Sequence, residues 1–347
     1  MFYPYKRLFA ILILIFLLTN ITYSKTAAGS FLDKDQRSIS DIDEVLKKKQ
    51  FILQKTQKSN TIEYISLYDE IAKLTILKNK LLWQMDKVDD IDTDKTCDLA
   101  LKYGEIEFIK TEYYQTPFHN EVAETLENMA TLLEQCYSPM AEKYLNSVLQ
   151  IKENIYGKES AEAAKAHDIL GDYYRISMAD FKKSITQYEK AKKIREKLFG
   201  IKDPRVTQNY GCLALSLFYH GDKAGRAEAL LHNAIDIRKN NSSAEDYPLY
   251  EAYMDLGNYY SVKGEDTKSI EYFQKALRSF NGKVNSDYIV MISELSQNYL
   301  NQDDLRNALK YGIEAYRVSK EFYGNSGHFK VLENYNRLNE IRDRVKK

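Results

Sequence analysis

Apolar residues recur at helical spacing along most of the chain, in segments of similar length separated by short polar turns. The stretch 163–239 shows this best, because two consecutive segments carry the same features in the same order. Each has a helix-period segment with one small residue, a turn, and a second helix-period segment with two small residues. These are Gly171, Ser184 and Ala191 in the first copy and Ala214, Ala227 and Ala234 in the second. The repetition predicts stacked helical hairpins.

The same features continue on both sides of this stretch. The small residue that opens each second helix falls at Ala100, Ala141, Ser184, Ala227, Ser269 and Ala308, at intervals of 39 to 43 residues. First helices carry an apolar residue followed by a small one, at Met129-Ala130, Leu170-Gly171, Leu213-Ala214, Leu256-Gly257 and Leu295-Ser296. Small side chains at a helix crossing let the two backbones approach closely. The sequence therefore predicts an all-α solenoid of about five antiparallel hairpins over residues 96–325.

Helical patterns without the repeat flank this array. Segments 42–58 and 61–87 have broad apolar faces, and we interpret 41–95 as a helical N-terminal cap. Coiled-coil pairing is less favoured there because no heptad is sustained. At the other end, residues 326–347 carry one more amphipathic pattern and predict a capping helix.

The N-terminus resembles a bacterial-type secretory signal. Lys6 and Arg7 precede the apolar run 8–18, and small or polar residues follow. The apolar run is short for a membrane span. We expect a signal peptide over 1–24, or an uncleaved anchor, followed by a flexible mature start over 25–40. The protein is thus expected to be exported, either to a periplasm or out of the cell, and to meet a membrane only through an uncleaved N-terminal segment.

Charge and composition narrow the choice of partners. The 50 Lys and Arg balance 50 Asp and Glu, so no net field favours nucleic acid, and we expect no nucleic-acid binding. With only 14 Gly and 5 Pro against 28 Tyr, the chain suits long packed helices with short connections.

The three cysteines fit an exported protein without proving export. Cys97 lies near the start of the helical segment 99–114 and Cys136 follows the segment 121–135, so both fall at the same end of an antiparallel hairpin. A disulfide between them is possible in an oxidising compartment, and two unlinked thiols are the alternative. Cys212, beside Leu213 in a helix, is interpreted as a packing residue.

Motifs for catalysis are missing from the sequence. The five histidines show no metal-binding spacing, and no phosphate-binding loop or serine or cysteine nucleophile motif occurs. The acidic run 89–94 lacks the Gly and Glu of a calcium loop, because Lys95 and Leu101 occupy those positions. We interpret it as a solvated loop that caps the next helix. We expect no enzyme, no cofactor and no metal site.

The best-preserved units resemble a known repeat family. Residues 191–200 (AKKIREKLFG), 203–206 (DPRV) and Leu213-Ala214 are similar to the tetratricopeptide repeat (TPR), in the roughly 42-residue form of kinesin light chains. The match is strong over 141–280, fair over 99–140 and 281–325, and absent before about residue 95. The resemblance implies a right-handed superhelix whose first helices line a concave groove for peptides or partner proteins.

By register, the resemblance also implies which residues face that groove. The candidates are Lys165, Asp168, Asp172, Arg175, Leu215, Phe218, Met254 and Asn258. Residues Glu124, Glu127 and Glu134 make the N-terminal end of the groove acidic. Leu215, Phe218 and Met254 are the favoured contacts, because an apolar group on a solvent-facing surface suggests a partner. The alternative for all three is burial in the hairpin core, through a shift of register.

Three functional hypotheses remain. The leading one is an exported, non-enzymatic scaffold that binds a partner protein or peptide in the groove. The second is a self-associating envelope component, and the third is a secreted, host-directed factor. Kinesin-type binding of acidic cargo peptides is not supported, because only Lys165, Arg175 and Asn258 supply the basic and asparagine side chains that such binding uses.

Overall fold

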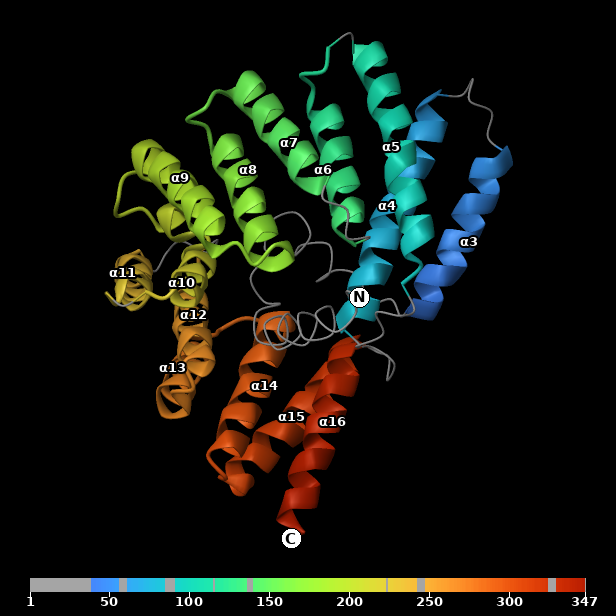
Figure 1. Cartoon of the computed structure of the whole chain (residues 1–347). Coiled ribbons are helices and arrows are strands. Elements are labelled where there is room, and N and C mark those ends of the chain that lie inside the picture. The colour runs from blue at the N-terminus through green and yellow to red at the C-terminus, as the bar shows by residue number, and fades with distance from the viewer. Residues whose placement is uncertain are drawn as a thin grey trace, which may run out of the picture. The chain divides into compact units, whose positions relative to one another are not determined.

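The computed structural model describes residues 39–55, 61–84, 91–114, 116–135, 140–222, 224–241, 247–323 and 329–346. They form helices and turns, and no strand occurs in these ranges (Figure 1). The described residues fall into two compact units, 39–170 and 171–346. The all-α prediction is confirmed. The predicted signal peptide and most of the flexible mature start lie outside the described residues.

The first unit contains a series of helices, most of which pack against a neighbour in sequence. They are α3 (Ile39–Lys55), α4 (Thr61–Gln84), α5 (Thr93–Tyr114), α6 (Asn120–Gln135), α7 (Ala141–Tyr156) and most of α8 (Ala161–Asp172). Helix α3 contacts α4, α5 contacts α6, α6 contacts α7, and α4 also reaches α6. One buried ammonium links three of them: Lys110 Nζ in α5 lies 3.0 Å from Asp69 Oδ2 in α4 and donates to Thr125 Oγ1 in α6 at 2.7 Å.

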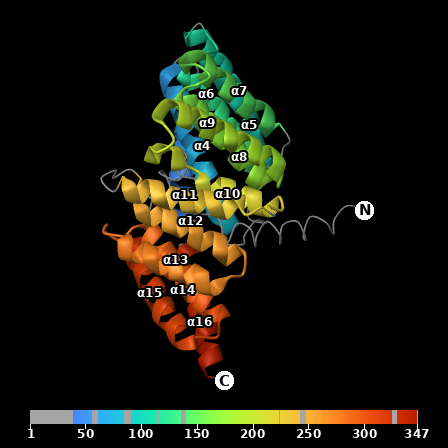
Figure 2. The same ribbon diagram turned by 90° about the vertical axis from the view of Figure 1, so that its left-hand side faces the viewer.

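The second unit is a stack of hairpins. After the end of α8 come a π-helix, η2 (Tyr173–Ser177), α9 (Phe181–Phe199), a 3₁₀ turn, η3 (Pro204–Thr207), α10 (Tyr210–Tyr219), α11 (Arg226–Asn240), α12 (Leu249–Val262), α13 (Asp266–Ser279), α14 (Ser286–Asn301), α15 (Leu305–Tyr323) and α16 (Phe329–Val345). Within hairpins, α10 packs on α11, α12 on α13 and α14 on α15. Between hairpins, α11 packs on α12, α13 on α14 and α15 on α16, and the layers are visible in Figure 2. The predicted solenoid architecture is therefore confirmed.

The predicted small residues lie at the helix crossings. All six that open second helices, Ala100, Ala141, Ser184, Ala227, Ser269 and Ala308, are fully buried. The two helices of a hairpin approach so closely at these residues that a hydroxyl on one can reach a carbonyl on the other. Ser269 Oγ of α13 donates to the Gly257 carbonyl of α12 at 2.9 Å. Likewise, Ser296 Oγ donates to the Ala308 carbonyl at 3.0 Å. A larger side chain at these positions would separate the two helices.

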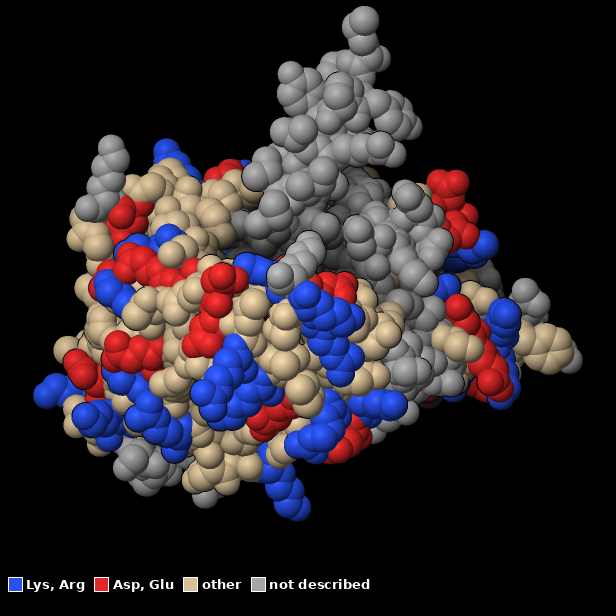
Figure 3. All heavy atoms as spheres, turned by 90° about the horizontal axis from the view of Figure 1, so that it is seen from below, with Lys and Arg blue, Asp and Glu red and all other residues tan. Residues whose placement is uncertain are grey.

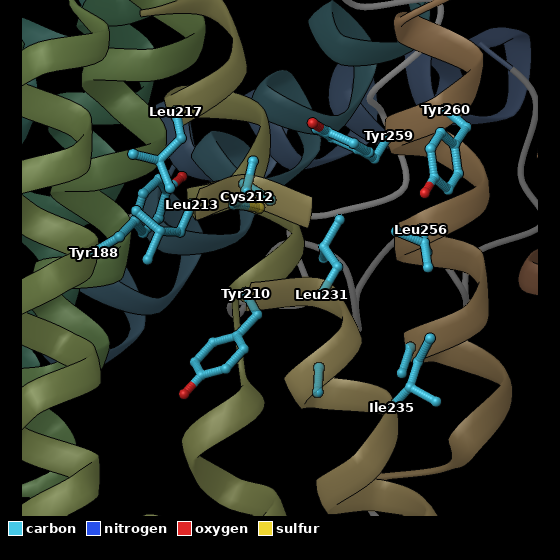
Figure 4. Packing of buried hydrophobic residues seen from close by; sticks show 14 residues of the cluster. Tyr188, Tyr210, Cys212, Leu213, Leu217, Leu231, Ile235, Leu256, Tyr259 and Tyr260 are labelled. Carbon is cyan, nitrogen blue, oxygen red and sulfur yellow. The ribbon is translucent and has the colours of Figure 1, made fainter. Parts of the chain in front are cut away.

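A continuous apolar core runs between α9 and α12. Leu213 and Leu217 of α10, Leu231 and Ile235 of α11 and Leu256 of α12 belong to one buried cluster, shown in Figure 4. Cys212 lies in the same cluster and is buried, and it is not part of a disulfide. The interpretation of Cys212 as a packing residue is confirmed.

Several helix boundaries have a clear local cause. Gly157 (φ +91°, ψ 153°) and Gly200 (φ +85°, ψ 151°) end α7 and α9 in a backbone region that only glycine reaches easily. Asp92 accepts a hydrogen bond from the Lys95 N–H at 3.0 Å and caps α5, as predicted. Asp203 caps the 3₁₀ turn η3 rather than the α-helix that follows it.

Candidate protein-binding surface

Most residues predicted to face the groove are buried. Lys165 is exposed and Phe218 is half-buried, whereas the other six side chains, Asp168, Asp172, Arg175, Leu215, Met254 and Asn258, are buried. The expectation that Leu215 and Met254 are solvent-facing apolar groups is wrong, because they are 2% and 3% exposed. Whether these residues contact a partner stays a prediction.

These side chains are buried because α10 and α12, the first helices of two neighbouring hairpins, pack against other helices on several sides. Helix α10 contacts α9, α11 and α12, so the position two residues after a core leucine is covered as well. Met254 belongs to a core cluster with Phe273 and Met291. The sequence did carry this signal, because α10 (YGCLALSLFY) is apolar all round and such helices are buried.

Phe218 is fixed by two aromatic neighbours. Its ring meets Tyr219 edge-on with centroids 5.2 Å apart, and Tyr259 of α12 edge-on at 5.9 Å. Such pairs add about 0.5–1.5 kcal/mol to simple burial. Phe218 therefore packs between neighbouring first helices and does not project freely.

The predicted acidic end of the groove is partly neutralised. Glu124 of α6 is exposed but forms an ion pair of 2.7 Å with Lys73 of α4. The pKa of Glu124 is lowered, because the Lys73 ammonium outweighs the cost of burial. This edge presents a mixed charge rather than an acidic patch.

A buried polar network joins the end of α8 to α9. The Tyr188 hydroxyl donates to Asp172 Oδ1 at 2.6 Å, and Arg175 Nη2 donates to the same oxygen at 3.0 Å. Arg175 Nε lies 3.3 Å from the Tyr188 oxygen. Burial alone would lower the pKa of Arg175, but Tyr188, Cys212 and Asp172 raise it further than burial lowers it. Burial raises the pKa of Tyr188 well above its usual range, so the phenol stays neutral.

The second unit leaves several buried polar atoms without a partner. Among residues 171–346 as described, these are Asp172 Oδ2, Arg175 Nη1, Asn209 Nδ2, Asp255 Oδ1, Asn258 Nδ2 and Asn334 Nδ2. Asp172 ends α8, Arg175 lies on η2, Asn209 directly precedes α10, Asp255 and Asn258 lie on α12, and Asn334 lies on α16. None of the six lies on α9, α11, α13 or α15. In residues 39–170 the corresponding atoms lie on α4, α5 and α6. Thr111 lies on α5, a second helix, so the distribution is one-sided only in residues 171–346. A buried polar atom without a partner costs about 1–3 kcal/mol, so that distribution needs an explanation.

Other polar side chains connect neighbouring first helices. Ser293 Oγ of α14 donates to Asn334 Oδ1 of α16 at 2.6 Å. Arg337 of α16 donates to Gln297 Oε1 at 3.0 Å and to the Ser293 carbonyl at 2.9 Å. The amide nitrogen of Asn334 is left over from this network. The α14–α16 contact therefore combines these polar groups with apolar pairs such as Leu300 with Ile341.

Cys97 is disulfide-bonded. Cys136 lies outside the described residues, so the pairing of Cys97 with Cys136 stays a prediction.

Within the described ranges, no group of His, Cys, Asp and Glu side chains could hold a metal ion. The described helices also include none long and apolar enough to cross a membrane. Basic and acidic side chains are intermingled on the face shown in Figure 3, without a patch of one sign.

No protein-family model matches the sequence, and no curated protein matches it. Among solved structures, BtubC (BKLC) from P. vanneervenii is similar with a TM-score of 0.44 and 17% identity, covering 75% of this chain and 96% of that one. A protein of Podosopora anserina described as a putative kinesin light chain with nearly identical TPR-like repeats gives a TM-score of 0.43 at 14% identity, over 57% of this chain and 94% of that one. A point variant of the latter gives 0.45 at 14% identity, over 58% and 96%. At these scores the hairpins described above, rather than the likenesses, define the fold.

Proposed function

We propose that the protein is an exported, non-enzymatic scaffold that binds a partner protein or peptide along the first helices of residues 171–346. The single observation that carries this proposal is the placement of unpartnered buried polar atoms on those helices. A bound chain supplies main-chain donors and acceptors, and it would remove the cost of leaving these atoms unpaired.

Export is supported by two features that do not depend on the helices. The first 24 residues have the order of a secretory signal, with Lys6 and Arg7 ahead of an apolar run. Cys97 is disulfide-bonded, and disulfides persist mainly in oxidising compartments. A periplasmic or extracellular location agrees with both.

The test is peptide selection followed by one matched pair of substitutions. Purified protein is screened against displayed random peptides of about 12 residues, and dissociation constants of selected peptides are measured by fluorescence polarisation. Asn258→Leu on α12 removes an amide whose nitrogen has no partner, at similar volume. Asn233→Leu makes the same change at an exposed position of the second helix α11.

We expect Asn258→Leu to weaken peptide binding by about tenfold, the effect of one lost hydrogen bond, and Asn233→Leu to leave it unchanged. Circular dichroism checks that both variants remain folded. A screen that retains no peptide, or equal affinities for Asn258→Leu and the wild type, would overturn the proposal.

A further inference from the structure

The first helix of one hairpin contains an extra residue. In three hairpins an acidic residue after the first helix donates its N–H to the carbonyl five residues earlier: Asp222 to Leu217, Glu265 to Tyr260 and Asp304 to Tyr299. The equivalent residue Asp180 reaches back six residues, to Tyr174, at 2.8 Å. The inserted residue is absorbed by the π-helix η2, and Ala179 takes the turn with φ +50°. Single π-turns of this kind often mark functional sites.

The same region carries a charged pair that the three following hairpins lack at the equivalent positions. The position five residues after the core leucine is Arg175 here, but Phe218, Ser261 and Leu300 in the hairpins that follow. Arg175 is 1% exposed and Asp172 is 8% exposed. Arg175 uses Nε and Nη2 within the network, so Nη1 remains without a partner. Asp172 accepts twice at Oδ1, while Oδ2 remains without one.

These two atoms define the chemistry of what could bind them. Nη1 is a donor and Oδ2 is an acceptor, and the charges of the two side chains already balance each other. A carboxylate or an ammonium would bring an uncompensated charge into a buried place, which is costly. A neutral group with one donor and one acceptor fits better. A residue of an extended chain presents such a pair, because its N–H and C=O point to the same edge.

We propose that Asp172 and Arg175 form a subsite for the main chain of the bound partner. Asp172 Oδ2 accepts from a main-chain N–H, and Arg175 Nη1 donates to the carbonyl of the same residue. This subsite rests on the proposed function. Because both atoms are closed to solvent, the peptide reaches them when the π-helical turn opens. Hydrogen exchange of the Met178 and Asp180 amides, which bond to Tyr173 and Tyr174, reports that opening.

The deciding experiment alters the peptide rather than the protein. A peptide selected on the wild-type chain is N-methylated one residue at a time, which removes a single main-chain donor. We expect one position to lose about tenfold to a hundredfold in affinity, the effect of one hydrogen bond to a charged group. In Asp172→Asn, the acceptor is weakened, so the penalty for methylation at that position should shrink.

Three results would overturn the subsite and leave the proposed function standing. In the first, the peptide tolerates N-methylation at every position. In the second, binding is lost when one Asn or Gln side chain of the peptide is replaced, and not when a main-chain N–H is methylated. In the third, a folded Asp172→Asn variant shows the same methylation penalty as the wild type. A buried water satisfying both atoms would give the first result. If Asp172→Asn does not fold, the ¹⁵N side-chain signals of Arg175 in the wild type decide, since they must shift when the peptide binds. A failed peptide screen would overturn both proposals.

Discussion

The ring of Tyr188 in α9 occupies the space that a side chain at Gly171 in α8 would need. A Cβ atom placed on Gly171 would lie 2.6 Å from Tyr188 Cε1 and 2.8 Å from Cδ1. Real Cβ atoms essentially never approach a ring carbon so closely, and the ring is held by Asp172 and Arg175. The position of the Tyr188 ring therefore requires glycine at residue 171.

Replacing Gly171 with alanine should destabilise the second unit by about 1–3 kcal/mol, because the Tyr188 ring must move out of its network. Urea unfolding followed by circular dichroism measures the loss. Gly104→Ala in α5 is the control, since among the described residues no atom outside the local backbone of its own helix lies within 4 Å of its added Cβ. That variant should gain up to about 1 kcal/mol from the better helix propensity of alanine. Equal effects of the two substitutions would contradict the close contact.

Replacing Tyr188 with phenylalanine should cost about 1–3 kcal/mol, because it removes a donor to the buried Asp172 carboxylate. The control is Tyr210→Phe in α10, a buried tyrosine for which the structure gives no hydroxyl hydrogen bond. Its loss should stay within about 0.5 kcal/mol. Thermal unfolding midpoints of the two variants are measured under the same conditions. A larger loss for Tyr188→Phe would be due to the hydrogen bond to Asp172, whereas equal losses would mean that removing any buried hydroxyl destabilises this core.

The repeat could be predicted from sequence because its spacing depends on contacts within each hairpin. Ala227 and Ala308 lie at crossings as expected, since only small residues fit there. Which side chains stay accessible to solvent depends on how neighbouring hairpins pack. The repeat spacing within one hairpin does not contain that information. Leu215 lies two residues from Leu213, on the opposite side of α10, and it is buried nonetheless because α10 has neighbours on several sides. The π-helix was also not predicted. The interval from Leu170 to Ser184 equals that from Leu213 to Ala227, which hides the inserted residue, although it is one residue longer than the interval from Leu256 to Ser269.

Asp255 should make the stability of the second unit fall as pH rises. This carboxyl of α12 is buried with Oδ1 unpaired, and its pKa is raised well above the usual range by burial and by the nearby Asp287. Above pH about 4 the unfolded chain releases this proton while the folded chain keeps it. The free energy of unfolding therefore decreases with pH until the raised pKa is passed.

The substitution Asp255→Asn should remove this decrease, because an amide has no proton to release in this pH range. The advantage of the variant over the wild type in urea unfolding should be small near pH 4 and should grow towards neutral pH. Asp236→Asn, at an exposed position of α11, serves as the control and should show no such growth. If the difference in unfolding free energy between Asp255→Asn and the wild type stays constant across this pH range, the pKa of Asp255 is not raised in the folded protein.

The disulfide of Cys97 should join it to Cys136 and stabilise the first unit. Cys212 is buried and is not part of a disulfide, so a bond within one chain leaves Cys136 as the partner. Closing a loop of this size is worth roughly 3–4 kcal/mol, and reduction should lower the unfolding midpoint of residues 39–170 accordingly. Mass spectrometry of a non-reduced tryptic digest should show the peptides of Cys97 and Cys136 linked, and Cys97→Ser should abolish the link. Alkylation of both thiols in unreduced protein, purified from an oxidising compartment, would contradict the pairing and weaken the case for export.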